Sequence, residues 1–262
     1  MAQHESFLTA VVADADALKA RAVLGGFTEM RERHSLTRVQ HFEPQDLTVK
    51  GFPTIKQLQK ERAPTAAQWQ ELHQILVKQP STLQVRTDIT DIVENTMRMG
   101  GEAPLEIPAD KPRLVRWTEF PEPTNPRLPF LTQRKTIEIS DPRAEKILAD
   151  NKFKVKSNLI EESYHWWLNN LEYILTRTFM VAGPDPAASQ PIPNLASMEP
   201  LVPFWILYVR ARVETTAPAT MPEQIRNAQT RLVHVRGQLM GVFDFKVFDR
   251  RCHDTRIQDR PA

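Results

Sequence analysis

The feature that most constrains this fold is a set of strand-like segments that are apolar on both alternating faces. Successive side chains of a strand point to opposite faces, so His4–Val12 (HESFLTAVV) predicts a strand covered on both sides. In Phe204–Val213, one face runs from Trp205 to Val213 without a charge. The other face places an aromatic and aliphatic centre beside two arginines: Phe204, Ile206, Tyr208, Arg210 and Arg212.

Further segments alternate in the same way and favour a mainly β fold. Asn169-Asn170 separates two of them, and because asparagine tolerates positive φ, this pair predicts a two-residue hairpin turn. Many strands with few helices indicate a closed multi-stranded antiparallel β-barrel, with a filled interior and a partly covered exterior. The other expected strands are Ser35–Phe42, Thr82–Asp88, Arg113–Phe120, Lys135–Ser140, Phe153–Val155, Tyr164–Leu168, Leu171–Val181 and Phe243–Val247.

Few segments have helical periodicity. One helix is expected from Asp14 to Gly25-Gly26, where glycine suits a left-handed C-terminal position. A longer helix is expected to open at Met221-Pro222, with apolar residues at helical spacing along one stripe. Shorter helices are expected after Thr65 and after Asp141-Pro142.

Proline divides the chain, which has 21 prolines and 8 glycines among its 262 residues. We expect a single domain, 1–262, with long loops or insertions at 44–80, 104–130 and 184–200, because proline withdraws a backbone donor and restricts φ. Glycine-rich phosphate-binding loops are missing from the sequence.

Charge and cysteine content exclude several classes of protein. Lys and Arg total 34 and Asp and Glu 32, which argues against a dedicated nucleic-acid binder. No apolar stretch approaches the ~20 residues of a membrane span, and the N-terminus lacks a signal pattern. A single cysteine, Cys252, fits a reducing compartment such as the cytosol or nucleus.

Motifs for catalysis or metal binding are weak, so we predict no catalytic residue, no metal site and no cofactor. The seven histidines form no metal-binding pair, and Cys252 near the chain end has no positioned base. A metal-dependent barrel phosphohydrolase needs paired lumen carboxylates, whereas the best candidate strand carries Glu138 alone. A metal-dependent barrel phosphohydrolase is therefore the alternative function. A barrel that binds a small ligand in a large apolar cavity is the third hypothesis.

An interface is the more informative interpretation of the aromatic residues. Trp166-Trp167 places one indole inward and one outward, so Trp167 is a candidate partner contact, although ordinary packing would give the same pair. Phe204, Ile206, Tyr208, Arg210 and Arg212 are expected to face a protein partner, with the Trp205–Val213 face inside the barrel. The competing interpretation is that the two arginines only cover the strand end at the solvent surface.

The order of these elements resembles the Mediator subunit 18 family, in a fungal-type form. The start His4–Leu8 resembles the family's opening strand, and Leu24-Gly25-Gly26-Phe27 stands where the family has an L-x-G-L turn. The central Leu148–Met180 is similar to the family's helix, extended strand and hairpin. Trp205–Val213, the helix Pro222–Leu239 with the following Val242–Val247, Asp249-Arg250 and the final Asp254-Thr255-Arg256 complete the match.

The resemblance covers a little over half of the chain and implies both fold and partners. It implies a barrel similar in architecture to metal-dependent triphosphatase tunnels, without their chemistry. It also implies a non-enzymatic subunit of the Mediator head module, in the nucleus, acting as a coregulator of RNA polymerase II. The implied partners are Mediator subunit 20, as a heterodimer, the C-terminal helix of Mediator subunit 8, and other head-module subunits.

Overall fold

The computed structural model describes residues 3–45, 65–98, 107–108, 110–181, 198–214 and 218–257. The strands of this part of the chain are β1 (Gln3–Ala13), β2 (Arg33–Pro44), β3 (Leu83–Asp88), β4 (Arg113–Thr118), β5 (Thr132–Ser140), β6 (Phe153–Leu168), β7 (Leu171–Met180) and β8 (Phe204–Val213). Its α-helices are α1 (Ala17–Thr28), α3 (Ala66–Lys78), α4 (Thr90–Arg98), α5 (Ala144–Asp150) and α6 (Met221–Gln238). Short 3-10 turns lie at η1 (Asp14–Asp16), η3 (Pro218–Thr220) and η4 (Arg250–His253).

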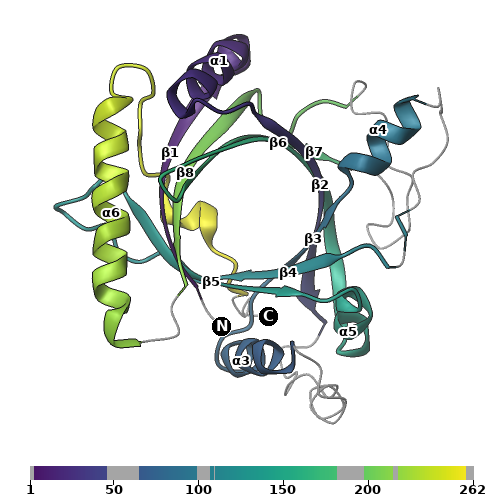
Figure 1. The fold of residues 1–262 in the computed structure, drawn as a ribbon. Coiled ribbons are helices and arrows are strands. Elements are labelled where there is room, and N and C mark those ends of the chain that lie inside the picture. Colours follow the sequence, from purple (N-terminus) through teal and green to yellow (C-terminus); the bar gives the residue numbers. More distant parts are fainter. Residues whose placement is uncertain are drawn as a thin grey trace.

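The strands close into one antiparallel barrel, seen end-on in Figure 1. Their order around the wall is β1-β5-β4-β3-β2-β6-β7-β8, and β8 returns to pair with β1. That closing pair runs from His4 opposite Val213 to Ala13 opposite Phe204. The predicted fold class, a mainly β closed antiparallel barrel, is therefore confirmed.

The β6–β7 hairpin forms the longest part of the wall. Asn169 and Asn170 have φ of 53° and 60°, so both central turn residues are left-handed, as the sequence predicted. Because β6 is one strand of 16 residues, it also pairs along its length with β2, and so links the hairpin to the opposite end of the barrel.

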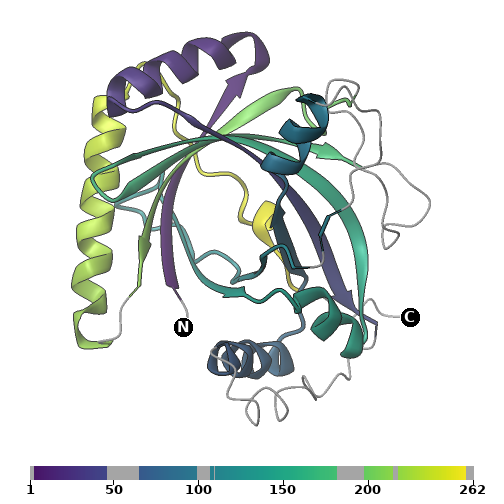
Figure 2. The same cartoon turned by 45° about the vertical axis from the view of Figure 1, so that its right-hand side comes forward.

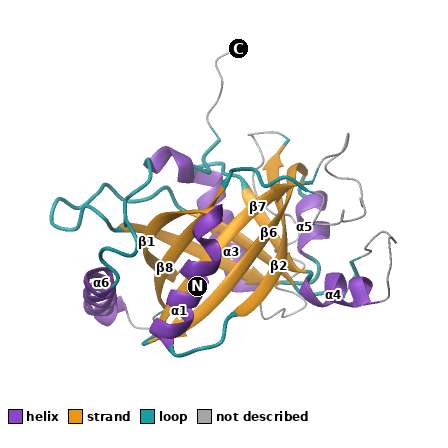
Figure 3. Cartoon of the chain, turned by 90° about the horizontal axis from the view of Figure 1, so that it is seen from above, coloured by secondary structure: helices purple, strands orange, loops and turns teal. Residues whose placement is uncertain are grey.

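The apolar packing lies outside the wall, between the strands and the helices that surround them (Figures 1 and 3). In the first of three clusters, β1, β7 and β8 pack against α1 and α6, with residues such as Leu207 from the wall and Leu232 from the helix. Burying such side chains stabilises the fold by about 1.5–3 kcal/mol each. Two adjoining helices therefore cover the outer face of these strands.

Two smaller clusters cover the rest of the wall. α3 and α5 pack on β3, β4 and β5, where Trp69, Leu72 and Ile137 are fully buried. Val93 of α4, with Ile89 just before that helix, packs on the outer face of β2 and β6. Figure 2 shows α1 and α6 together on one side of the barrel and α3 and α5 together on another, with the yellow C-terminal segment that carries η4 between the walls.

The predicted orientation of β8 is wrong. Trp205, Leu207 and Val209 face outward into the first cluster, while Tyr208, Arg210 and Arg212 line the lumen. The expected apolar filling of the barrel is wrong for the same reason. A barrel can turn its apolar faces outward when its own helices cover them, and the interior can then be polar.

Some boundaries also differ from the sequence predictions. α1 continues through both glycines to Thr28, and Glu29 takes the left-handed position with a φ of 53°. The strand expected at Phe243–Val247 is instead irregular chain with one bridge, Ala10 to Phe245, and both phenylalanines are buried beside β1. The helix predicted at 221–238 is confirmed.

The proline-rich stretches lie partly outside the described residues, which omit 46–64, 99–106 and 182–197. Within the first stretch lies α3, and within the second lies β4. Among the helices that the structure describes, none has the length and apolar character needed to cross a membrane.

The outward packing of β8 predicts unequal effects for two tryptophans. Trp205 is 4% exposed and donates its indole N–H to Asp14 Oδ1 at 2.9 Å, so Trp205→Ala should cost about 3–5 kcal/mol of unfolding free energy. Trp167 is 39% exposed, so Trp167→Ala should cost less than about 1 kcal/mol. Denaturant melts of both variants measure the difference, and equal losses would contradict the burial of Trp205 in the first cluster.

Candidate functional site: the barrel lumen

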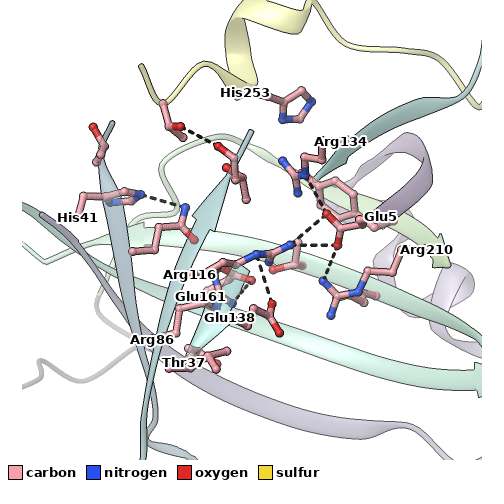
Figure 4. A pocket seen from close by; sticks show the side chains of 18 of the residues that line it. Glu5, Thr37, His41, Arg86, Arg116, Arg134, Glu138, Glu161, Arg210 and His253 are labelled. Carbon is pink, nitrogen blue, oxygen red and sulfur yellow. Dashed lines mark hydrogen bonds and ion pairs between the residues drawn. The ribbon is translucent and has the colours of Figure 1, made fainter. Parts of the chain in front are cut away.

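The lumen holds a polar cavity of about 630 Å³ (Figure 4). Its lining side chains come from strands all round the barrel, because alternate residues of each strand point inward. Six of them carry a positive charge: Arg86, Arg116, Arg134, Lys156, Arg210 and Arg212.

At the centre of the lumen, the carboxylate of Glu5 is 2% exposed and accepts hydrogen bonds from three arginines. Arg116 Nη2 lies 3.0 and 3.1 Å from its two oxygens, Arg134 Nε lies at 2.8 Å and Arg210 Nη1 at 3.4 Å. These arginines belong to β4, β5 and β8, and Arg134 stands opposite Glu5 in the β1–β5 register. One carboxylate on β1 thus joins three other strands.

A second set of ion pairs extends this network around the wall. Glu138 on β5 accepts from Arg212 at 3.0 Å and lies 3.4 Å from Arg116 Nε. On the far side, Arg86 makes two hydrogen bonds of 2.9 Å to Glu161. Such bidentate pairs between half-buried side chains have a defined geometry as well as a charge.

Glu172 of β7 completes the network. It accepts from Arg210 Nε at 2.7 Å and contacts His165 Nδ1 at 3.0 Å. Arg210 therefore bridges the carboxylates of Glu172 and Glu5.

The pKa shifts follow from burial and from these neighbours. Burial alone would raise the pKa of the Glu5 carboxyl, but Arg116, Arg134 and Arg210 hold it well below its usual range. Burial lowers the pKa of Arg212, and the positive charge of Arg210 lowers it further. Burial also raises the pKa of Tyr208 to about 12, which keeps its hydroxyl protonated at neutral pH.

The C-terminal segment closes part of the lumen, and residues Cys252–Thr255 line the cavity. The ring of His253 lies 5.8 Å from that of Phe7, edge to face, and burial lowers the pKa of His253 to about 4. Thr255 Oγ1 donates to the carbonyl of Thr118 on β4 at 3.0 Å. In Figure 4 this segment passes over the charged network, with His253 pointing toward Arg134.

The structure separates the residues that the sequence placed together in an interface. Tyr208, Arg210 and Arg212 line the lumen, where the two arginines pair with Glu172 and Glu138. Phe204 and Ile206, on the same inward face of β8, line a small hollow near the start of that strand, and Tyr208 lines both this hollow and the lumen cavity. Trp167 lies at the β6–β7 hairpin, partly exposed and stacked on His165 at 5.8 Å.

Sequence reasoning missed the centre of the site. Glu5, Arg116 and Arg134 carry no local motif, and Glu5 and Arg116 are 111 residues apart in the chain. The available signal was the alternation of side chains along β8, which places Arg210 and Arg212 on the same face of that strand. Two arginines on one strand face indicate counter-charges on the strands beside it.

The geometry suits ion pairing and anion binding more than metal chemistry. Glu5, Glu138 and Glu161 are each bonded to arginine guanidinium groups. Over the described residues, His, Cys, Asp and Glu nowhere gather in threes in a way that could hold a metal ion. Cys252 is an exposed free thiol at the end of the cavity.

Comparison with known proteins settles the family. The profile described as "Med18 protein" matches residues 4–256, nearly the whole chain. The chain belongs to the Med18 protein family. The resemblance predicted from the sequence is thereby confirmed.

A chain of a solved Mediator head module shows the same fold, and two other solved structures match less well. A chain in the Schizosaccharomyces pombe Mediator head module matches with a TM-score of 0.61 and 12% identity, covering 93% of this chain and 98% of that one. A conserved hypothetical protein from Pyrococcus furiosus matches with a TM-score of 0.41 and 11% identity, covering 90% of each chain. A Hippeastrum adenylyl cyclase candidate with a dominant triphosphatase activity gives 0.40 and 10%, covering 89% of this chain and 88% of that one. Among curated proteins nothing matches this chain.

Removing the central carboxylate should destabilise this Med18-family barrel strongly. Glu5→Gln leaves Arg116, Arg134 and Arg210 short of a buried counter-charge, so we expect a loss of about 3–5 kcal/mol in unfolding free energy. The matched control is Asp150→Asn, which breaks the exposed Lys146–Asp150 pair of α5 and should cost less than about 1 kcal/mol. Urea denaturation measures both, and equal small losses would show that the network is not structural.

The lumen also predicts an acid-sensitive fold. Burial would raise the pKa of Glu172, but the hydrogen bond from His165 and the charge of Arg210 lower it from 4.5 to about 2. A folded-state pKa below the ordinary value gives stability that is present above pH 4.5 and lost as the pH falls toward 2.

Glu172→Gln should therefore flatten the fall in stability between about pH 4.5 and pH 2. Glu223→Gln, which changes an exposed glutamate on α6, should leave the wild-type curve unchanged. Chemical melts across this pH range test the prediction. Parallel curves for Glu172→Gln and the wild type would contradict it.

Proposed function

We propose that this chain is a non-enzymatic structural subunit of the Mediator head module, which acts in the nucleus as a coregulator of RNA polymerase II transcription. The observation that carries the proposal is the family match over residues 4–256. The fold likeness to a chain of the S. pombe head module, over 98% of that chain, supports it. The chain's role is then to present folded surface to its neighbours.

The proposed partners are Mediator subunit 20, in a heterodimer, and the C-terminal helix of Mediator subunit 8. Exposed apolar side chains support a binding role, because a surface for partners exposes such residues outside the core. They include Leu18 on α1 and Met240 just after α6, which are 74% and 70% exposed, and Trp167 on the hairpin.

The six residues predicted at the interface differ in how exposed they are and in whether they line the lumen. Trp167 is exposed and stays a proposed partner contact. Phe204 and Ile206 also stay proposed contacts, but they lie half-buried on the inward face of β8, at the end of that strand away from the β6–β7 hairpin. Tyr208, Arg210 and Arg212 are engaged in the lumen, so any partner that touches them must reach through the barrel mouth.

The alternative, a metal-dependent phosphohydrolase, is disfavoured by the pairing of the lumen carboxylates. A metal held against a phosphate needs free carboxylate oxygens, yet Glu138 lies between Arg116 and Arg212. A divalent ion could bind the Glu138 carboxylate only if the ion pairs of Glu138 with Arg116 and Arg212 broke.

Affinity purification of the tagged full-length chain from its host tests the proposal. We expect Mediator subunits 20 and 8 and other head-module subunits to co-elute in stoichiometric amounts. Recovery of the folded chain without any Mediator subunit would overturn the proposal.

The hairpin tryptophan provides a sharper test. Trp167→Ala should weaken binding of the subunit 20 and subunit 8 partners by about 1–3 kcal/mol, the usual range for a partly buried aromatic contact. Val77→Ala truncates an apolar residue of similar exposure on α3 and should bind normally. Binding curves with purified partners measure the effect. Normal binding by Trp167→Ala would remove this residue from the interface.

A further inference from the structure

A groove runs along one flank of α6, outside the barrel. Two adjoining hollows form it, of about 530 and 410 Å³, and both are lined by Thr230 and Arg231. The first hollow lies between α6 and the end of β8, where Val213 and Glu214 line it. The second lies between α6, the β6–β7 hairpin and the end of α1. In Figure 1, α6 stands beside β8 and β1, so the groove follows the seam between helix and wall.

The helix side of the groove is a stripe of polar side chains. Residues of α6 spaced three, four, three and four apart share one face of a helix, and those in the groove are Gln224, Asn227, Arg231, His234 and Gln238. At 1.5 Å per residue, this stripe extends about 21 Å. The neighbouring stripe, with Ala228 and Leu232, is buried against the barrel. Hydrogen-bonding groups therefore line the groove along its whole length.

Arg231, where the two hollows meet, has unused hydrogen-bonding capacity. Its Nη1 lies 3.4 Å from the carbonyl oxygen of Asn169, while its buried Nε has no hydrogen-bond partner. Over the part of the chain that the structure describes, no carboxylate forms an ion pair with Arg231, whereas Arg210 and Arg212 in the lumen each have one. A guanidinium carries five N–H donors and prefers a carboxylate as its acceptor.

The second hollow is apolar beside this charge. Its lining includes Phe27 of α1, Leu168 and Leu171 of the hairpin, and Val235 of α6. His234 and Asn169 lie at the same hollow and supply polar groups. An apolar pocket beside polar groups is typical of the place where one protein anchors a side chain of another.

We infer that this groove binds an extended, acidic segment of a partner protein, with one apolar side chain in the second hollow and a neighbouring carboxylate on Arg231. The amides of Asn227 and Gln238 can bond the free N–H and C=O groups of an extended chain. A helix has already paired those groups internally, so the stripe favours an extended occupant. Glu214 would repel a second acidic residue at the far end, which places the partner's carboxylate near the hairpin.

This inference rests on the proposed role in partner binding and names a surface that the proposed function does not specify. An extended chain rises about 3.3 Å per residue, so about six residues would fill the groove. The expected sequence is therefore short, with Asp or Glu close to one large apolar residue.

Overlapping peptides of about twelve residues, covering the Mediator head-module subunits, provide the probe, because they are twice the length that fills the groove. An array of them is incubated with the full-length chain, and fluorescence anisotropy then gives Kd for the strongest peptides. We expect binding by peptides in which an acidic residue lies close to an apolar one. A lysine in place of that acidic residue should abolish binding to the wild type.

Charge reversal at the centre of the groove tests the contact itself. Arg231→Glu should raise Kd by at least about tenfold, because the partner's carboxylate then meets a like charge. Arg226→Glu makes the same change at an exposed position of α6 outside the groove and should bind like the wild type. The lysine-substituted peptide should bind Arg231→Glu more tightly than it binds the wild type. A variant that was merely destabilised would not gain affinity in this way.

Three results would overturn the inference. They are no peptide binding to the wild type, equal weakening by Arg231→Glu and Arg226→Glu, and binding by a helical peptide. A proline substitution at each peptide position in turn detects the last case, because a helix tolerates proline only in its first turn. Wild-type chain that co-elutes with Mediator subunits but binds no peptide would overturn this inference alone. Wild-type chain that recovers no Mediator subunit would instead overturn the proposed function.

Discussion

One buried carboxylate, that of Glu5, organises the interior on which the rest of the structure depends. Three guanidinium groups from three other strands converge on it, and 205 residues separate Glu5 from Arg210 along the chain. Removing charges from water costs several kcal/mol per ion, so the group is tolerated only because the pairing is nearly complete. The network therefore specifies which strands are neighbours more than it adds net stability.

An ionic interior changes where the hydrophobic effect acts in this fold. The apolar faces of the wall turn outward, and helices cover them in three separate clusters. The helices thus bury apolar side chains that would otherwise be exposed to solvent on the outside of the barrel. Each cluster joins only part of the wall, whereas the hydrogen bonds between neighbouring strands run all the way round the barrel. This arrangement leaves the barrel axis free for polar groups.

Alternation in the sequence was enough to predict the strands, the Asn169-Asn170 turn and the barrel, but not which face points inward. A period of two is the same pattern whichever face is buried, and only the positions of the covering helices decide between them. Trp205 and Tyr208 were assigned to the wrong faces for this reason. Glu5 was missed because its partners lie more than a hundred residues away, where no local window contains them. Arg210 and Arg212 were recognised as a pair, although their counter-charges were not.

The closing pair of the wall has a consequence for how the chain reaches its fold. β1 is made before β8, with which it pairs, and the segment after α6 returns to β1 through a hydrogen bond from the Lys246 N–H to the Thr9 carbonyl. The barrel therefore cannot close until the chain as far as β8 has left the ribosome. Until then β1 has one unpaired edge, and pairings so distant in sequence form slowly. Nascent chains of this family consequently have a long interval in which a chaperone or another subunit can bind the open edge.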